Sequence, residues 1–144
     1  MKLSTRTRYG LRAIIELAEH SGAIPLQTKV IDGSQEISVK YLEQLMTILR
    51  SAGFVRSIRG SKGGYMLAKS PNQIKISDVF DCLEGHVTTV ECVEDRSFCE
   101  RTEDCVARQV WEQVQQAIKN VLQSITLQDL VDRARNKKLS NYQI

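Results

Sequence analysis

The sequence lacks the long apolar runs that characterise membrane proteins. No window of its 144 residues approaches the apolar stretch of a membrane-spanning helix, which takes roughly 18 residues. Residues 1–4 lead directly into a polar, amphipathic pattern, without the apolar core of a signal peptide. Internal repeats and low-complexity tracts are absent as well. The 42% hydrophobic and 26% charged residues are typical of a globular chain. Because the sequence shows neither a signal peptide nor a membrane span, we expect a cytoplasmic protein with no membrane partner.

Catalytic groups are also scarce. The chain has two histidines, His20 and His86, and it contains no Cys-x-x-Cys pair and no glycine-rich nucleotide loop. A thiol-dependent enzyme needs a base or a second thiol beside its nucleophile. The sequence offers little of either, and we predict that the chain is not an enzyme.

Charge is distributed unevenly along the chain. Residues 1–70 hold 11 Lys and Arg against 5 Asp and Glu, whereas residues 71–144 hold 9 against 12. An excess of positive charge in one half indicates that this half meets a polyanion.

Apolar spacing predicts three helices and a hairpin in the basic half. A glycine-rich turn at 60–64 separates the two strands. The predicted elements are a helix from Ser4 or Thr5 to about His20, a short helix from Leu26 to about Ile31 followed by a turn at Gly33, a helix from Ser38 to Gly53, and strands at 54–59 and 65–68.

The apolar pattern of residues 71–144 predicts further helices on either side of an aperiodic segment. A wide apolar stripe around Trp111 marks the longest of them. The predicted elements are a short strand at 74–76, a helix from Asp78 to about Glu84, a loop at 86–104, a long helix at 106–124, a last helix capped by Thr126, and a frayed tail at 136–144.

The order helix, short helix, helix and basic hairpin is that of a winged helix-turn-helix domain. We therefore predict a mainly α fold with a small β-wing, an α+β fold. The expected parts are a DNA-binding domain at 1–85, a cysteine-containing loop at 86–105, and a dimerisation helix with a C-terminal helix and tail at 106–144.

The helix that begins at Ser38 offers polar side chains to a major groove. Gln44 can read adenine, Glu43 can accept a hydrogen bond from cytosine, and Lys40 can bind guanine or phosphate. Arg59, on the glycine-rich tip, suits a narrow minor groove. The predicted DNA contacts are Ser38, Lys40, Tyr41, Glu43, Gln44, Arg59, Gly60, Ser61 and Lys62.

Three cysteines share the aperiodic loop, as Cys92-x6-Cys99-x5-Cys105. Three thiolates can hold an iron–sulfur cluster and leave one position for another ligand. Zinc is an alternative, although the close cysteine pair usual in zinc sites is missing. Redox thiols and incidental cysteines are the other interpretations, and the many acidic neighbours disfavour reactive thiolates. Cys82 is expected to lie in the core.

Segments along nearly the whole chain resemble the IscR, NsrR and CymR family of bacterial transcription regulators. The resemblance rests on Leu3–Ala13, Ile37–Leu45, Val55–Leu67 and Ile76–Val79, with Glu84-Gly85 and the long helix that follows. It implies a homodimer joined through the helix at 106–124 and bound to double-stranded DNA at a roughly palindromic operator.

The resemblance also favours an iron–sulfur cluster at Cys92, Cys99 and Cys105, of 2Fe–2S type, with 4Fe–4S as the alternative. IscR-type members often carry a histidine three residues after the third cysteine, where this chain has Arg108. The fourth ligand stays open among His86, Glu91 and a group of the partner subunit. CymR-like members imply the alternative of a cluster-free regulator controlled by zinc, thiol oxidation or a partner protein.

Overall fold

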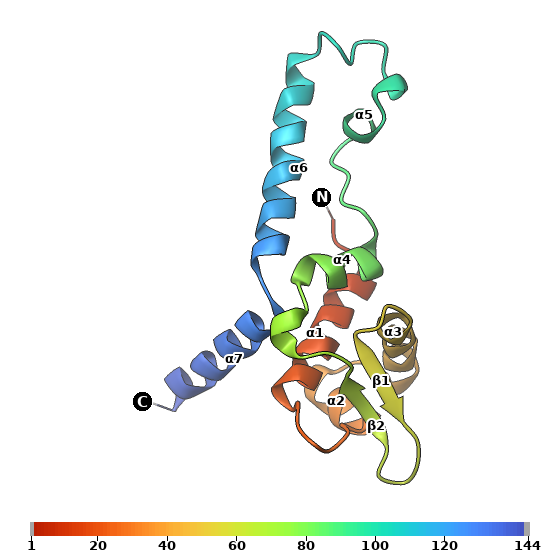
Figure 1. Ribbon diagram of the computed structural model, residues 1–144, viewed down its shortest axis with the longest axis vertical. Coiled ribbons are helices and arrows are strands. Elements are labelled where there is room, and N and C mark those ends of the chain that lie inside the picture. The colour runs from red at the N-terminus through yellow and green to blue at the C-terminus, as the bar shows by residue number, and fades with distance from the viewer. Residues whose placement is uncertain (1, 143–144) are drawn as a thin grey trace.

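The structure is a computed structural model that describes residues 2–142, and it consists of a helical body from which one long helix rises (Figure 1). The cysteine loop lies at the far end of that helix, while the last helix and the hairpin lie on opposite sides of the body (Figure 1). A mainly helical chain with one small antiparallel sheet confirms the predicted fold class. The elements are α1 (Thr5–Glu19), α2 (Thr28–Gln35), α3 (Val39–Ser51), β1 (Val55–Ile58), β2 (Gly64–Leu67), η1 (Pro71–Gln73), α4 (Ile76–Glu84), α5 (Glu91–Glu94), η2 (Arg96–Phe98), α6 (Val106–Ser124) and α7 (Leu127–Asn141).

The core lies where α1, α3 and α4 meet. Ile14 of α1, Leu45 and Leu49 of α3, and Leu83 of α4 are buried in one apolar cluster. A Cβ at Gly10 would lie 2.7 Å from Leu83 Cδ1, so the glycine lets α1 and α4 approach closely. This packing holds α3 against α1 and α4.

The wing is attached to the body at its base. β1 and β2 pair antiparallel, with Ile58 opposite Gly64. Leu26, between α1 and α2, exchanges two backbone hydrogen bonds of 2.9 Å with Tyr65 of β2. A side chain at Gly64 would overlap the Leu26 carbonyl, so a glycine is needed where the two segments touch.

The predicted bounds of the second helix are wrong. α2 begins at Thr28 and not at Leu26, because Leu26 pairs with β2 in extended conformation. Gly33, predicted to form a turn, lies inside α2. The helix ends at Gln35, and the C-cap Glu36 has a left-handed φ of 56°. The contact with the wing, which is remote in sequence, overrides the local pattern.

The predicted strand at 74–76 is also wrong. Only Lys75 forms an isolated bridge, with Thr126, and α4 already begins at Ile76. The Ile76 amide donates to the Ile125 carbonyl at 2.9 Å, so the junction of α6 and α7 is bonded to the start of α4.

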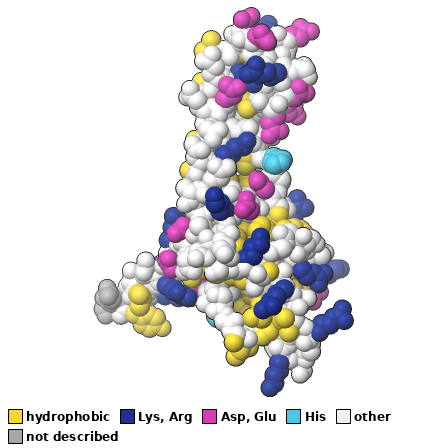
Figure 2. All heavy atoms as spheres, viewed as in Figure 1, with side chains coloured by type: hydrophobic (Ala, Val, Ile, Leu, Met, Phe, Trp, Pro, Cys, Tyr) yellow, Lys and Arg dark blue, Asp and Glu magenta, His cyan; other side chains and the backbone are white. Residues whose placement is uncertain are grey.

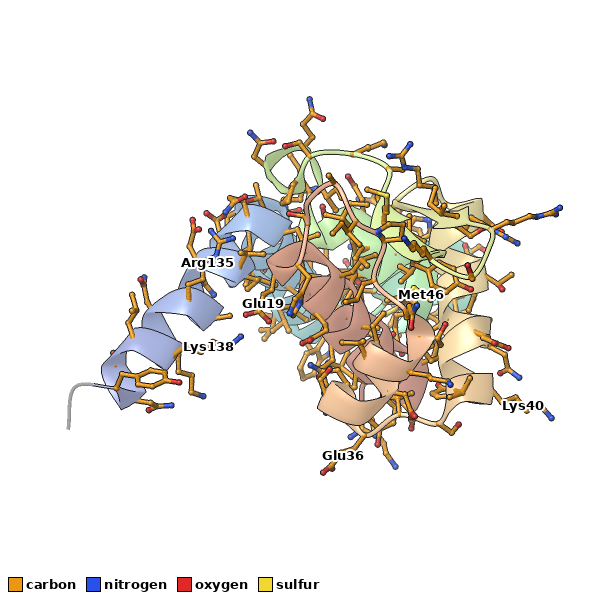
Figure 3. All side chains as sticks on the ribbon, turned by 90° about the horizontal axis from the view of Figure 1, so that it is seen from below. Glu19, Glu36, Lys40, Met46, Arg135 and Lys138 are labelled. Carbon is orange, nitrogen blue, oxygen red and sulfur yellow. The ribbon has the colours of Figure 1, made fainter. Side chains whose placement is uncertain are left out.

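The C-terminal segment is more ordered than the predicted frayed tail. α7 continues to Asn141, and residues 143–144 lie outside the described part. Thr126 and Asp129 form a reciprocal capping box at its start. Farther along, Lys138 points toward Glu19 of α1 (Figure 3), and the two form an ion pair of 2.8 Å. None of the helices described over residues 2–142 has the length and apolar character needed to cross a bilayer.

Candidate nucleic-acid interface and cysteine loop

The first turns of α3 present most of the predicted reading residues to solvent. The Ser38 hydroxyl accepts from the Tyr41 amide at 3.3 Å and so caps the helix. Lys40, Glu43 and Gln44 are exposed, and Lys40 extends away from the body in Figure 3.

Tyr41 differs from these neighbours because its ring is half-buried. It packs edge-on against Tyr9 of α1, with 6.1 Å between ring centroids. The Arg12 guanidinium lies 5.3 Å from the centre of the Tyr9 ring. Tyr41 therefore helps to hold the start of α3 on α1 as well as facing outward.

Glycines shape the wing tip. The Gly63 amide donates to the Gly60 carbonyl at 3.0 Å, and Gly60 has a φ of 113°, which favours glycine. A side chain at Gly63 would overlap the backbone of Ile58. Gln27 Nε2 donates to the Ser61 carbonyl at 3.4 Å and so connects the tip to the start of α2.

Arg59, Ser61 and Lys62 are exposed on this tip. A groove of about 510 Å³ lies between the start of α2, α3 and the wing. Among the predicted contacts, Glu43, Arg59, Gly60 and Ser61 line this groove. Ser38, Lys40, Tyr41, Gln44 and Lys62 are not among its lining residues. Their role in DNA contact stays a prediction, as does that of the groove residues.

The groove also contains residues that the sequence interpretation missed. Thr28 and Lys29 line it at the start of α2, and Val39, Ser57 and Ile58 line it from α3 and β1. Strand alternation could have indicated Ser57, because it shares a strand face with Arg59. Thr28 and Lys29 could not be assigned to the groove from the sequence, because the pattern placed the start of α2 at Leu26 and not at Thr28.

The surface charges segregate along the molecule. In Figure 2, dark-blue basic side chains gather on the lower body around the wing, and magenta acidic ones gather on the loop beyond α6. The acidic loop residues are Glu91, Glu94, Asp95, Glu100, Glu103 and Asp104. A polyanion is therefore attracted to the body and repelled by the loop.

The three loop cysteines occupy different settings. Cys92 lies half-buried on α5, Cys99 is exposed after η2, and Cys105 is half-buried as the N-cap of α6. Cys92 and Cys99 line one open hollow of about 640 Å³, which Cys105 does not line. Within residues 2–142, no three His, Cys, Asp or Glu side chains are gathered closely enough to hold a metal ion. The donor set suits an iron–sulfur cluster, but the thiols are not assembled around one point.

The candidate fourth ligands are separated by position. Glu91 lines the same hollow as Cys92 and Cys99, whereas His86 lines other hollows, beside Lys119 in one of them. Of these two side chains, only Glu91 is near the loop thiols.

Two polar residues attach this loop to α6. The Arg108 side chain is buried, and its Nε donates to the Cys92 carbonyl at 2.9 Å, while its guanidinium pairs with Glu112. Two turns along, Gln115 Oε1 accepts from the Thr89 amide at 3.1 Å. These contacts connect the cysteine segment to the long helix.

The outer face of α6 is apolar. Among the described residues of α6, only Arg108 and Gln115 are classed as buried, whereas Val110, Val114 and Val121 are 50%, 41% and 57% exposed. A helix with polar residues inside and apolar residues outside is the reverse of the usual surface pattern. The apolar stripe therefore has no covering within the described part of the chain.

Cys82 of α4 is separate from the loop thiols. It packs against the core, and its Sγ lies 3.2 Å from the Val79 carbonyl. Burial, with a smaller contribution from Asp81, raises the pKa of the Cys82 thiol to about 11. Its predicted place in the core is met only in part, because Cys82 is half-buried against the core.

Comparison with known proteins places this architecture in a family. Residues 3–133 match the Rrf2 family model, described as an iron-dependent transcriptional regulator. The chain is 44% identical over 130 residues to the transcriptional regulator CymR of Bacillus subtilis, covering 90% of this chain and 89% of CymR. It is 41% identical over 131 residues to protein rrf2 of Nitratidesulfovibrio vulgaris, covering 91% and 87%.

Solved structures give the same result. CymR of B. subtilis, described as its global cysteine regulator, superposes with a TM-score of 0.79 at 42% identity, covering 92% of this chain and 98% of CymR. IscR of T. potens superposes with a TM-score of 0.75 at 40% identity, covering 93% and 88%. Relatives are named as transcriptional regulators rather than as enzymes. This chain belongs to the Rrf2 family of transcriptional regulators.

Proposed function

We propose that the chain is a homodimeric regulator that binds double-stranded DNA at a roughly palindromic operator. The observation that carries this proposal is the groove that Glu43 of α3 and Arg59 of the wing both line. A reading helix beside a basic hairpin tip can contact base edges and backbone together. Residues 1–85 form the DNA-binding part, and the protein acts in the cytoplasm, where the bacterial chromosome lies.

The dimer is supported by the faces of α6. Exposed Val110, Val114 and Val121 recur at steps of four and seven residues, and this spacing builds a seam between paired helices. A second copy of the same helix would cover the stripe and place two reading helices on one duplex. Residues 106–144 are therefore the dimerisation part, and a twofold arrangement accounts for a palindromic operator.

Operator affinity is controlled by an iron–sulfur cluster held by Cys92, Cys99 and Cys105 in the loop at 86–105. When bound, such a cluster supplies one-electron redox chemistry and sensitivity to oxidants. The family's iron dependence and the similarity to IscR support this, and 2Fe–2S is favoured over 4Fe–4S. Arg108 and Gln115 hold the loop on α6, so a change at the thiols reaches the helix that sets the spacing of the two DNA-binding parts.

A second candidate is a cluster-free regulator controlled by zinc, thiol oxidation or a partner protein. The similarity to CymR, which exceeds that to IscR in both identity and TM-score, favours it. The separation of Cys105 from the hollow shared by Cys92 and Cys99 is compatible with it.

DNA binding is tested with two arginines of one hairpin. Arg59 lines the groove, whereas Arg56 lies on the opposite face of the wing. We expect Arg59→Ala to weaken binding to the selected operator about 10- to 100-fold and to lower the salt dependence by about one counterion. Arg56→Ala removes the same charge and should weaken binding much less. Equal loss in both variants contradicts the proposed contact.

The mode of control is tested by metal analysis. Protein purified without oxygen is assayed for iron and sulfide and its visible spectrum is recorded, for wild type and Cys92→Ala. Iron and sulfide in wild type, with both reduced in Cys92→Ala, support the cluster. A colourless wild-type protein that cannot be reconstituted with iron and sulfide contradicts the cluster and supports the cluster-free regulator.

A further inference from the structure

One apolar side chain of α3 is exposed at the groove between α3 and the wing. Val39, the first residue of α3, is 39% exposed and lines this groove of about 510 Å³. Ile58, the last residue of β1, is 38% exposed and also lines the groove, but strand alternation sets its side chain on the face of Arg56. The other large apolar side chains exposed within residues 2–85, which are Leu3, Ile24 and Val30, do not line it.

Charged groups surround this apolar side chain. Glu43 lies one turn after Val39 on the same face of α3, and Arg59 lines the groove from the wing. Lys29 contributes a second cation from α2. The charges favour a polyanion with hydrogen-bonding edges, while Val39 offers an apolar surface between them.

The occupant must therefore combine negative charge with a small apolar group. In the major groove of DNA only thymine, among the four ordinary bases, presents a methyl group. We infer that Val39 binds the C5-methyl group of a thymine in each half-site of the operator. This inference rests on the proposed DNA-binding function and adds a specificity determinant to it.

The expected contribution of this contact is modest and measurable. Burial of one methyl group changes affinity about fourfold, and two half-sites change it about 15-fold. Val39 is 39% exposed, so truncation to alanine leaves the core intact.

The experiment compares thymine with uracil, which lacks only the methyl group. The tightest duplex is first selected from a random-sequence library by the wild-type protein. Each thymine of that duplex is then replaced by deoxyuridine, and Kd is measured at one salt concentration. We expect about a fourfold loss at one thymine, or two adjacent ones, in each half-site.

Protein variants assign the effect to Val39. In Val39→Ala the ratio of Kd values for uracil and thymine should fall to about one. Val30→Ala is the matched control, because Val30 is 46% exposed on α2 outside the groove and its ratio should stay at the wild-type value.

The possible failures are distinguishable. Tight binding with no loss at any deoxyuridine overturns the methyl contact and leaves the regulator standing. A thymine preference that persists in Val39→Ala also overturns it, since the methyl would then act through DNA shape. If the library gives no preferred duplex, both the regulator proposal and this inference fail.

Discussion

The side chain of Arg108 and the backbone carbonyl of Cys92 are joined by a hydrogen bond of 2.9 Å. They lie 16 residues apart, on α6 and α5. The Arg108 side chain is only 8% exposed, and its charge is balanced by Glu112. An arginine at this position therefore fastens the cysteine loop to the long helix.

Replacing Arg108 should loosen that attachment. Arg108→Met retains much of the buried stem but loses the hydrogen bond and the ion pair. We expect a loss of about 1–3 kcal/mol in the free energy of unfolding and faster amide hydrogen exchange at residues 90–94. Arg101→Met, at an exposed loop position, is the control. Unchanged exchange in Arg108→Met would contradict the fastening role.

A charge on the outer face of α6 should separate the proposed dimer. In Val121→Asp, a carboxylate replaces an exposed apolar side chain of the stripe, so helical content stays and self-association weakens. Sedimentation velocity should show a monomer, with operator affinity reduced at least about tenfold. Asn120→Asp places the same charge one residue away on the polar side and should remain dimeric. A dimeric Val121→Asp would refute this use of α6.

Glu84 should make stability depend on pH. Its carboxylate accepts from the Ser4 hydroxyl at 2.6 Å and from the Thr7 hydroxyl, and these hydrogen bonds hold the pKa of Glu84 below its ordinary value of 4.5. The bonds to the ionised form stabilise the fold above the unfolded-state pKa, and this stability is lost as pH falls through the folded-state pKa.

The test compares melting temperatures of wild type and Glu84→Gln between about pH 3 and pH 7. The variant should melt at a lower temperature near neutral pH, and the difference should shrink on acidification. Glu94→Gln, at an exposed carboxylate of the loop, should match wild type. A difference that is constant with pH would show that the ionised form of Glu84 is not what stabilises the fold.

The four cysteines should differ in reactivity. Because burial raises the pKa of Cys82 to about 11, its thiolate is rare near pH 8, whereas Cys99 is exposed. In reduced, chelator-treated protein, iodoacetamide should modify Cys99 first and Cys82 last, as followed by peptide mass spectrometry. In denaturant the difference should disappear. Equal rates in the native protein would contradict the buried position of Cys82.

Local patterns predicted the elements whose causes are local. Ser38 caps α3 through the amide three residues later, and Thr126 with Asp129 forms a capping box, so both helices could be found from the sequence. The hairpin followed from alternation around a glycine-rich turn. These elements contain Glu43 and Arg59, which explains why the predicted reading residues and the groove overlap.

Features that depend on remote contacts were not predictable in this way. The extended conformation of Leu26 comes from its pairing with Tyr65, and it moves the start of α2 and thereby Lys29 into the groove. The C-terminal part of α7 is held on α1 by the ion pair of Lys138 with Glu19, which lies 119 residues earlier in the chain. The sequence spacing of the loop cysteines likewise says nothing of Arg108, whose contact with Cys92 depends on how α5 packs on α6.

The wing tip contains two kinds of residue. Gly63 cannot accept a side chain without moving the backbone, whereas Arg59, Ser61 and Lys62 are in solvent and carry no packing. Mutations at the three exposed positions therefore leave folding almost untouched. Under the proposed DNA-binding role, a gene duplicate could acquire a new target site through those positions alone, so that divergence in recognition need not wait for compensating changes in the scaffold.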